Sequence, residues 1–82
     1  MSNEKKEPVD QAKLGNIIAS IWANQTDKGT FYNVTVQRFY RDGENWKYTD
    51  SFGRDDLLLV RKVLDTAHTK IYELLAADKA AA

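Results

Sequence analysis

The chain of 82 residues contains no cysteine, one proline and one histidine. Without cysteine, no disulfide can stabilise the fold and no cysteine-based metal site can form. No apolar run approaches the length of a membrane span or of the core of a signal sequence. We therefore expect a soluble, cytoplasmic protein that does not bind a membrane.

An excess of charge of one sign is also missing. Twelve basic residues balance twelve acidic residues, so the formal net charge is zero at pH 7. A protein that binds phosphates is usually strongly basic, and this balance therefore argues against tight nucleic-acid binding. The distribution is uneven, because the segment 13–54 contains six basic and four acidic residues. The predicted sheet is therefore mildly positive.

Motifs of known enzyme classes are absent. The sequence has no GxSxG, no HExxH, no glycine-rich phosphate loop and no cysteine nucleophile. His68 has no carboxylate cluster near it in sequence, which makes it a poor metal or catalytic candidate. Asp55 and Asp56 would point about 100° apart on a helix, so they fit a helix start better than a catalytic pair. We expect no enzyme activity, cofactor, metal or small-molecule substrate.

Apolar and polar residues alternate in three segments, which we predict to be strands: residues 14–24, 31–41 and 45–52. Turn-forming residues in the segment 25–30 separate the first two strands. Asp42 and Gly43 predict a tight hairpin between the second and third strands. Gly15 and Asn16 mark the point at which the first strand would divide if the sheet had four strands.

One long amphipathic helix follows, from residues 53–55 to about Ala77. Its apolar arc is roughly 160° wide at 100° per residue, whereas an ordinary surface helix needs little more than about 100°. The surplus predicts a homodimer held by this helix, with an interface that includes Leu58, Leu59, Val63 and Tyr72. In the alternative, the N-terminal segment folds over the helix.

Together these elements predict an α+β fold, in which a curved antiparallel meander of three to four strands is followed by one long C-terminal helix. We expect a single domain over residues 14–77, with flexible tails over residues 1–13 and 78–82. A domain of about 65 residues buries a modest fraction of its surface and is marginally stable alone. This small size also favours a dimer.

The two faces of the second predicted strand differ in composition. Its apolar face, with Val34 and Val36, is the expected core face, and Arg38 there would either extend to the sheet edge or pair with a helix carboxylate such as Asp65 or Glu73. The other face places aromatic rings among amides, a hydroxyl and a guanidinium, which is typical of a surface on which single-stranded nucleic acid stacks.

We therefore predict a nucleic-acid-binding face that combines side chains of all three predicted strands: Trp22, Phe31, Thr35, Gln37, Phe39, Arg41 and Lys47. The rings would stack on bases and the cations would meet phosphates. Trp46, Tyr48 and Tyr40 are expected in the core or at its rim. In the alternative, the rings pack on one another, or a bulge or one-residue slip in register turns this face inward.

Three sequence segments carry a resemblance to a known family: "GNIIASIW", "YNVTVQRFYRDGENWK" and the helix "DDLLLVRKVLDTAHTKIYELL". Their layout resembles that of the small single-stranded-DNA-binding proteins of the positive-cofactor-four and Whirly type, over residues 14–75. The resemblance implies a curved sheet backed by a helix, a dimer formed largely through helices, and single-stranded DNA bound across the sheets. It also implies a role in transcription regulation or DNA maintenance.

Two other classes of function compete with this one. A protein-interaction or structural module would use the same exposed aromatic face, because exposed aromatics serve protein interfaces equally well. An OB-fold binder of nucleic acid is a third possibility, but the long terminal helix leaves no room for the strands of its five-stranded barrel.

Overall fold

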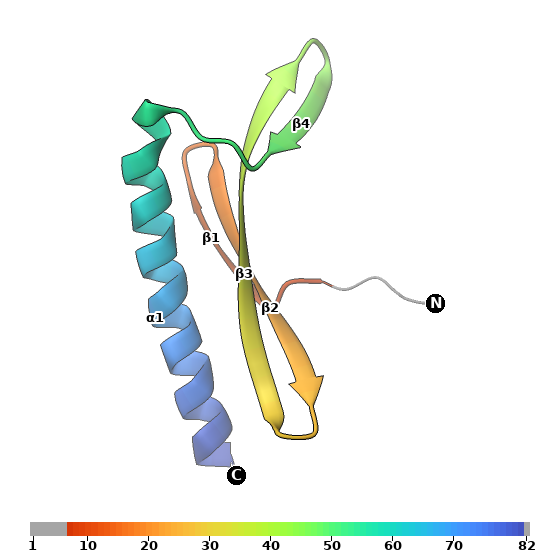
Figure 1. Cartoon of the computed structure of the whole chain (residues 1–82), viewed down its shortest axis with the longest axis vertical. Helices are drawn as coiled ribbons and strands as arrows, with labels where there is room; N and C mark the ends of the chain where they lie inside the picture. The colour runs from red at the N-terminus through yellow and green to blue at the C-terminus, as the bar shows by residue number, and fades with distance from the viewer. Residues whose placement is uncertain (1–6, 82) are drawn as a thin grey trace.

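The computed structural model of the chain describes residues 7–81. In this range four strands form one antiparallel sheet in the order β1-β2-β3-β4, and a single long helix follows (Figure 1). The strands are β1 (Asp10–Leu14), β2 (Ile17–Thr26), β3 (Gly29–Asp42) and β4 (Asn45–Thr49). A 3-10 turn, η1 (Arg54–Asp56), leads into the helix α1 (Leu57–Ala81). The predicted α+β meander with one C-terminal helix is therefore confirmed.

The first predicted strand divides in two at Gly15, which has a φ of +59° that few other residues adopt. Residues 10–13, predicted as part of a flexible tail, instead form most of β1, where Ala12 is buried opposite Ala19 of β2. At the other end α1 continues to Ala81 rather than ending near Ala77, so most of the second predicted tail is helical. Residues 1–6 and 82 of the predicted tails lie outside the described residues.

The helix packs on one face of the sheet, mainly against β1 and β2 and little against β3. Figure 1 shows it running alongside the strands. The buried core is small and lies between these elements: Ala12, Ile17, Ala19, Ile21, Val63 and Ala67. Half of these residues are alanines, and the largest fully buried side chains are those of Ile17, Ile21 and Val63. Within residues 7–81, the opposite face of the sheet has no helix over it.

Two of the residues predicted at a dimer interface are used by the chain's own core. Val63 is only 2% exposed and is not available to a partner, whereas Leu59 is half-buried against the core cluster. Their position follows from the helix lying directly on β1 and β2. Leu58 and Tyr72 point away from the sheet and are exposed.

The start of the helix is tied to β3 by Arg38. Its Nε lies 3.4 Å from Oδ2 of Asp56, so the carboxylate partner is in η1 and is neither Asp65 nor Glu73. The same Asp56 oxygen accepts a hydrogen bond of 2.8 Å from the Gly53 N–H. Asp56 therefore caps the first turn and holds Arg38 on the helix side of the sheet.

The middle of the helix is tied to β1 by an ion pair in which Lys70 Nζ lies 3.3 Å from Asp10 Oδ2. The pKa of Asp10 is lowered from 3.8, first by a hydrogen bond from the Gln11 backbone N–H and then by Lys70. A carboxylate whose pKa is lowered on folding stabilises the fold at pH values above its ordinary pKa. This stabilisation is lost as the pH falls through the folded-state pKa.

We therefore expect Asp10→Asn to make the stability of the fold less dependent on pH in the acid window below the ordinary carboxyl pKa of 3.8. Urea denaturation midpoints at several pH values within this window measure the effect. Asp27→Asn, in the exposed turn between β2 and β3, is the matched control and should keep the wild-type pH dependence. An acid loss of stability that is the same in Asp10→Asn and wild type would contradict the assignment.

Candidate nucleic-acid interface

The face of the sheet opposite α1, called the open face here, is built from alternate residues of all four strands. Residues that face each other across an antiparallel pair project to the same side of the sheet. The register pairs Ser20 with Thr35, Trp22 with Asn33 and Ile18 with Gln37, and places β2 and β3 in phase. The predicted residues of these two strands therefore lie together on the open face: Trp22, Phe31, Thr35, Gln37, Phe39 and Arg41.

The sequence prediction assigned the side chains of β4 to the wrong faces of the sheet. Asp42 pairs with Asn45 across a two-residue turn, which brings Phe39 opposite Tyr48 and Arg41 opposite Trp46. Both Trp46 and Tyr48 are therefore on the open face rather than in the core or at its rim.

Lys47 is on the helix side of the sheet, opposite Tyr40, and forms an ion pair of 2.8 Å with Asp42. The prediction assigned the large apolar side chains of β4 to the core. The register of a hairpin is set by its turn, however, and a shift of one residue exchanges the two faces. Lys47 is therefore not part of the open face.

Three rings form an aromatic cluster at one end of the open face: Phe39, Trp46 and Tyr48. The Phe39 and Trp46 centroids are 5.8 Å apart with the planes at 66°, and those of Phe39 and Tyr48 are 6.2 Å apart at 53°. Edge-to-face and tilted contacts of this kind are favourable for aromatic pairs. Trp46 and Tyr48 are 58% and 61% exposed, so the cluster presents most of its two outer rings to solvent.

Two cations flank the aromatic cluster. The Lys13 ammonium on β1 lies 5.0 Å from the centre of the Phe39 ring, and the Arg41 guanidinium lies 5.5 Å from the centre of the Trp46 ring. Lys13, Ile18 and the three rings line one hollow in the surface. Sequence reasoning missed Lys13 because it was assigned to the tail, although its alternation with Gln11 is a strand signal.

A second aromatic region lies at the other end of the open face. The Trp22 indole N–H donates a hydrogen bond of 2.8 Å to Oγ1 of Thr35, which holds the half-buried ring against the sheet. Phe31 nearby is exposed. From Phe31 to Phe39 the strand advances eight residues at about 3.3 Å each, or roughly 26 Å, which is long enough for several nucleotides. Thr35 is thus engaged in positioning Trp22.

The charge on the open face differs from the zero net charge of the chain. Among the strand residues of this face, Lys13 and Arg41 are the charged side chains. The strand carboxylates Asp10 and Asp42 belong to the other face, because they pair in register with Ile21 and Asn45. The open face therefore has a positive charge with no opposing carboxylate from its own strands.

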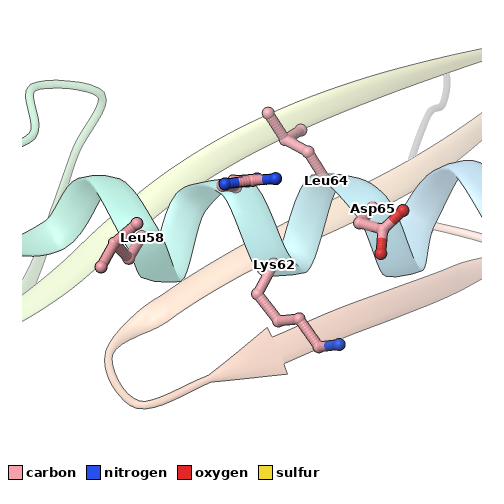
Figure 2. Close-up of a pocket in the computed structure, with 5 residues that line it drawn as sticks. Leu58, Lys62, Leu64 and Asp65 are labelled. Carbon is pink, nitrogen blue, oxygen red and sulfur yellow. The ribbon is translucent and has the colours of Figure 1, made fainter.

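The structure also contains a hollow on the outer surface of α1, lined by Leu58, Arg61, Lys62, Leu64 and Asp65 (Figure 2). All five residues belong to a single helix, and the side chains of Lys62 and Asp65 do not converge on one point, unlike those of a typical ligand site. No group of three or more His, Cys, Asp or Glu side chains within residues 7–81 is placed to hold a metal ion. None of the helical residues described forms a segment long and apolar enough to cross a membrane.

Comparison of the chain with known protein families, with curated proteins and with solved structures finds no match. The geometry of the open face is therefore the basis on which a function can be proposed.

Proposed function

We propose that this protein binds single-stranded nucleic acid along its open face, with DNA preferred and with little sequence specificity. The observation that carries the proposal is the exposed aromatic cluster with Lys13 and Arg41 beside its rings. Aromatic rings interleaved with cations on an uncovered sheet offer both of the groups that a single strand requires, a stacking surface and a counter-charge for phosphate.

Stacking supplies the larger part of the proposed affinity. Each base stacked on an aromatic ring contributes about 1–3 kcal/mol, and every base has a π-face, so binding tolerates different sequences. Trp46 and Tyr48 are already oriented by Phe39, which reduces the entropy lost on binding. The bases of a duplex are not free to stack on these rings, so duplex DNA should bind more weakly.

The cations position the strand without reading its bases. With Lys13 and Arg41 as the cations on the open-face strands, the salt dependence of binding should be shallow. The resemblance to the positive-cofactor-four and Whirly type supports DNA over RNA as the ligand, and it supports a role in transcription regulation or DNA maintenance.

A protein-interaction module is the second candidate, and the zero net charge favours it. The same exposed rings would then pack against a partner protein. The two functions differ in their response to salt, because counterion release weakens phosphate binding as salt rises, whereas an apolar interface lacks this dependence.

Two lysines on opposite faces of the sheet provide the test. We expect Lys13→Gln to weaken binding to oligo-dT and to lower the slope of log K against log salt by about 0.7, the value for one phosphate contact on a single strand. Lys47→Gln is the matched control and should leave the slope unchanged, because Lys47 lies on the other face and pairs with Asp42. Fluorescence anisotropy of labelled oligo-dT at several salt concentrations measures both slopes. Equal slopes for the two variants would contradict the assignment of the open face.

A further inference from the structure

Part of β3 has an unpaired edge. β2 pairs along one side of β3, whereas β4 pairs with its other side only over residues 38–42. Within residues 7–81, no strand pairs with residues 30–37 on that second side. Natural proteins protect such edges with charges, prolines or bulges, yet this stretch, TFYNVTVQ, contains no charged residue and no proline. We propose that a second copy of the chain pairs with this edge and joins the two sheets into one.

The backbone hydrogen bonds show which groups the edge offers. In an antiparallel pair, alternate residues exchange both hydrogen bonds with the residue opposite. The Phe39 N–H donates to the Asn16 carbonyl at 3.0 Å, which places the odd-numbered residues of β3 in the ladder with β2. The even-numbered residues from Thr30 to Val36 therefore direct their N–H and C=O groups away from β2, toward a partner strand.

The helix presents an apolar flank on the same side of the molecule. Asp78 accepts a hydrogen bond of 2.7 Å from the Tyr32 hydroxyl of β3, whereas Lys70 pairs with Asp10 of β1. The flank that bears Asp78 thus faces β3, and Figure 2 shows Leu64 pointing toward that side of the helix. Leu64 and Leu75 on this flank are 42% and 47% exposed.

These two features together favour a second copy as the occupant. An extended peptide would satisfy the backbone of the edge but would leave Leu64 and Leu75 uncovered. A second copy brings an identical strand and an identical helix flank, so one two-fold axis pairs the two edges and turns the two helix flanks toward each other on the same side of the joined sheet. The absence of charge from residues 30–37 removes the repulsion that would otherwise oppose pairing of identical strands.

The position of β4 limits the register. Because β4 occupies the edge from Arg38 onward, a second copy can pair with β3 only as far as Gln37, and the register that uses the whole free edge pairs residues 29–37 with themselves. Antiparallel pairing of residues 29–37 with themselves then centres on Asn33, which faces Asn33 of the second copy across the axis. Tyr32 faces Val34 of the second copy, an aromatic and β-branched pair that is favourable between strands.

This arrangement has a consequence for the open face. A two-fold axis perpendicular to the joined sheet places the open faces of both copies on the same side, which doubles the rings and cations available to one ligand. The dimer itself does not depend on the proposed nucleic-acid binding. Its test measures molar mass without nucleic acid, so failure of the dimer and failure of the binding function are distinguishable.

Charge reversal at the axis tests the pairing. Asn33 is exposed in the single chain, so Asn33→Asp and Asn33→Lys should both fold with the wild-type circular dichroism spectrum. Light scattering at tens of micromolar should give wild type twice the mass of one chain. Each variant alone should give the mass of one chain, because two like charges then face each other across the axis. An equal mixture of the two variants should restore the dimer mass, because Asp then faces Lys.

Thr69→Asp, on the exposed outer surface of α1, is the matched control and should remain a dimer. A wild-type protein with the mass of a single chain would overturn the proposal. A dimer in the Asn33→Asp variant, or an equal mixture that stays at the mass of one chain, would overturn it too. Loss of the dimer in Leu58→Glu with no effect of either Asn33 substitution would place the interface on the outer surface of α1 instead.

Discussion

Replacing Phe39 with alanine should weaken the binding of oligo-dT by about 1–3 kcal/mol, the range for loss of one stacking ring. This corresponds to roughly five- to 150-fold in Kd. Phe39 is the centre of the aromatic cluster, because it contacts Trp46 and Tyr48 and lies under the Lys13 ammonium. Its loss removes one ring and also releases the two outer rings from their fixed orientation. Fluorescence anisotropy of labelled oligo-dT measures the change.

Tyr40 provides the matched control, because it is the next residue along β3 and lies on the other face of the sheet. Tyr40→Ala also removes one ring from the same strand, yet it should leave binding within about twofold of wild type, a difference of roughly 0.4 kcal/mol. If Tyr40→Ala weakened binding as much as Phe39→Ala, the open face would not be the binding surface.

Trp46→Ala should resemble Phe39→Ala in binding and should cost little stability, since Trp46 is mostly exposed.

The largest expected effect on stability belongs to Ile21→Ala. Ile21 is fully buried between β2 and α1, and truncation of a buried isoleucine to alanine costs about 2–5 kcal/mol. Whole domains are stable by only about 5–15 kcal/mol, and a small one lies at the low end of that range. The variant should therefore be largely or partly unfolded at 37 °C. Thermal melting followed by circular dichroism measures the loss.

Ile18→Ala is the control for this substitution. Ile18 lies on the same strand but is half-buried on the open face, so the same truncation should lower the melting temperature by a much smaller amount. Similar losses in the two variants would indicate that the helix does not define the core face of β2.

The long strands and the helix could be predicted from the sequence because each has a sustained pattern. Residues of β3 alternate in character over the whole strand, and Asp42 and Gly43 mark the hairpin after it. The division of the first strand at Gly15 and Asn16 was left open, and residues 10–13 of β1 were assigned to the tail, for a physical reason. Of its residues, Ala12 alone is buried, and a single small side chain among polar neighbours produces no hydrophobic pattern.

The open face was predicted in part. The faces of β2 and β3 followed correctly from alternation, whereas β4 was assigned to the wrong face on the basis of its large aromatic residues. A two-residue turn after Asp42 places Asn45 opposite it and so places Tyr48 opposite Phe39. The length of the turn therefore predicts the correct face for β4. The prediction relied instead on the hydrophobicity of Trp46 and Tyr48.

The width of the helix arc illustrates a limit of sequence reasoning. The arc indicated more apolar surface than one sheet contact needs, but it did not show which part the sheet would cover. Because the helix packs mainly on β1 and β2, Val63 is buried in the core. Leu64 and Leu75 stay exposed on the flank next to β3. The choice between these positions depends on where the helix docks, which periodicity does not specify.

The most direct test of the proposed function is a tryptophan fluorescence titration of the Trp22→Phe variant with oligo-dT at low salt. The chain has two tryptophans, so this variant leaves Trp46 of the aromatic cluster as the single reporter. If bases stack on the cluster, its emission should be quenched to saturation, and a duplex of equal length should quench it less. An emission unchanged by oligo-dT, together with no mobility shift of the oligonucleotide, would contradict nucleic-acid binding and favour a protein partner on the same face.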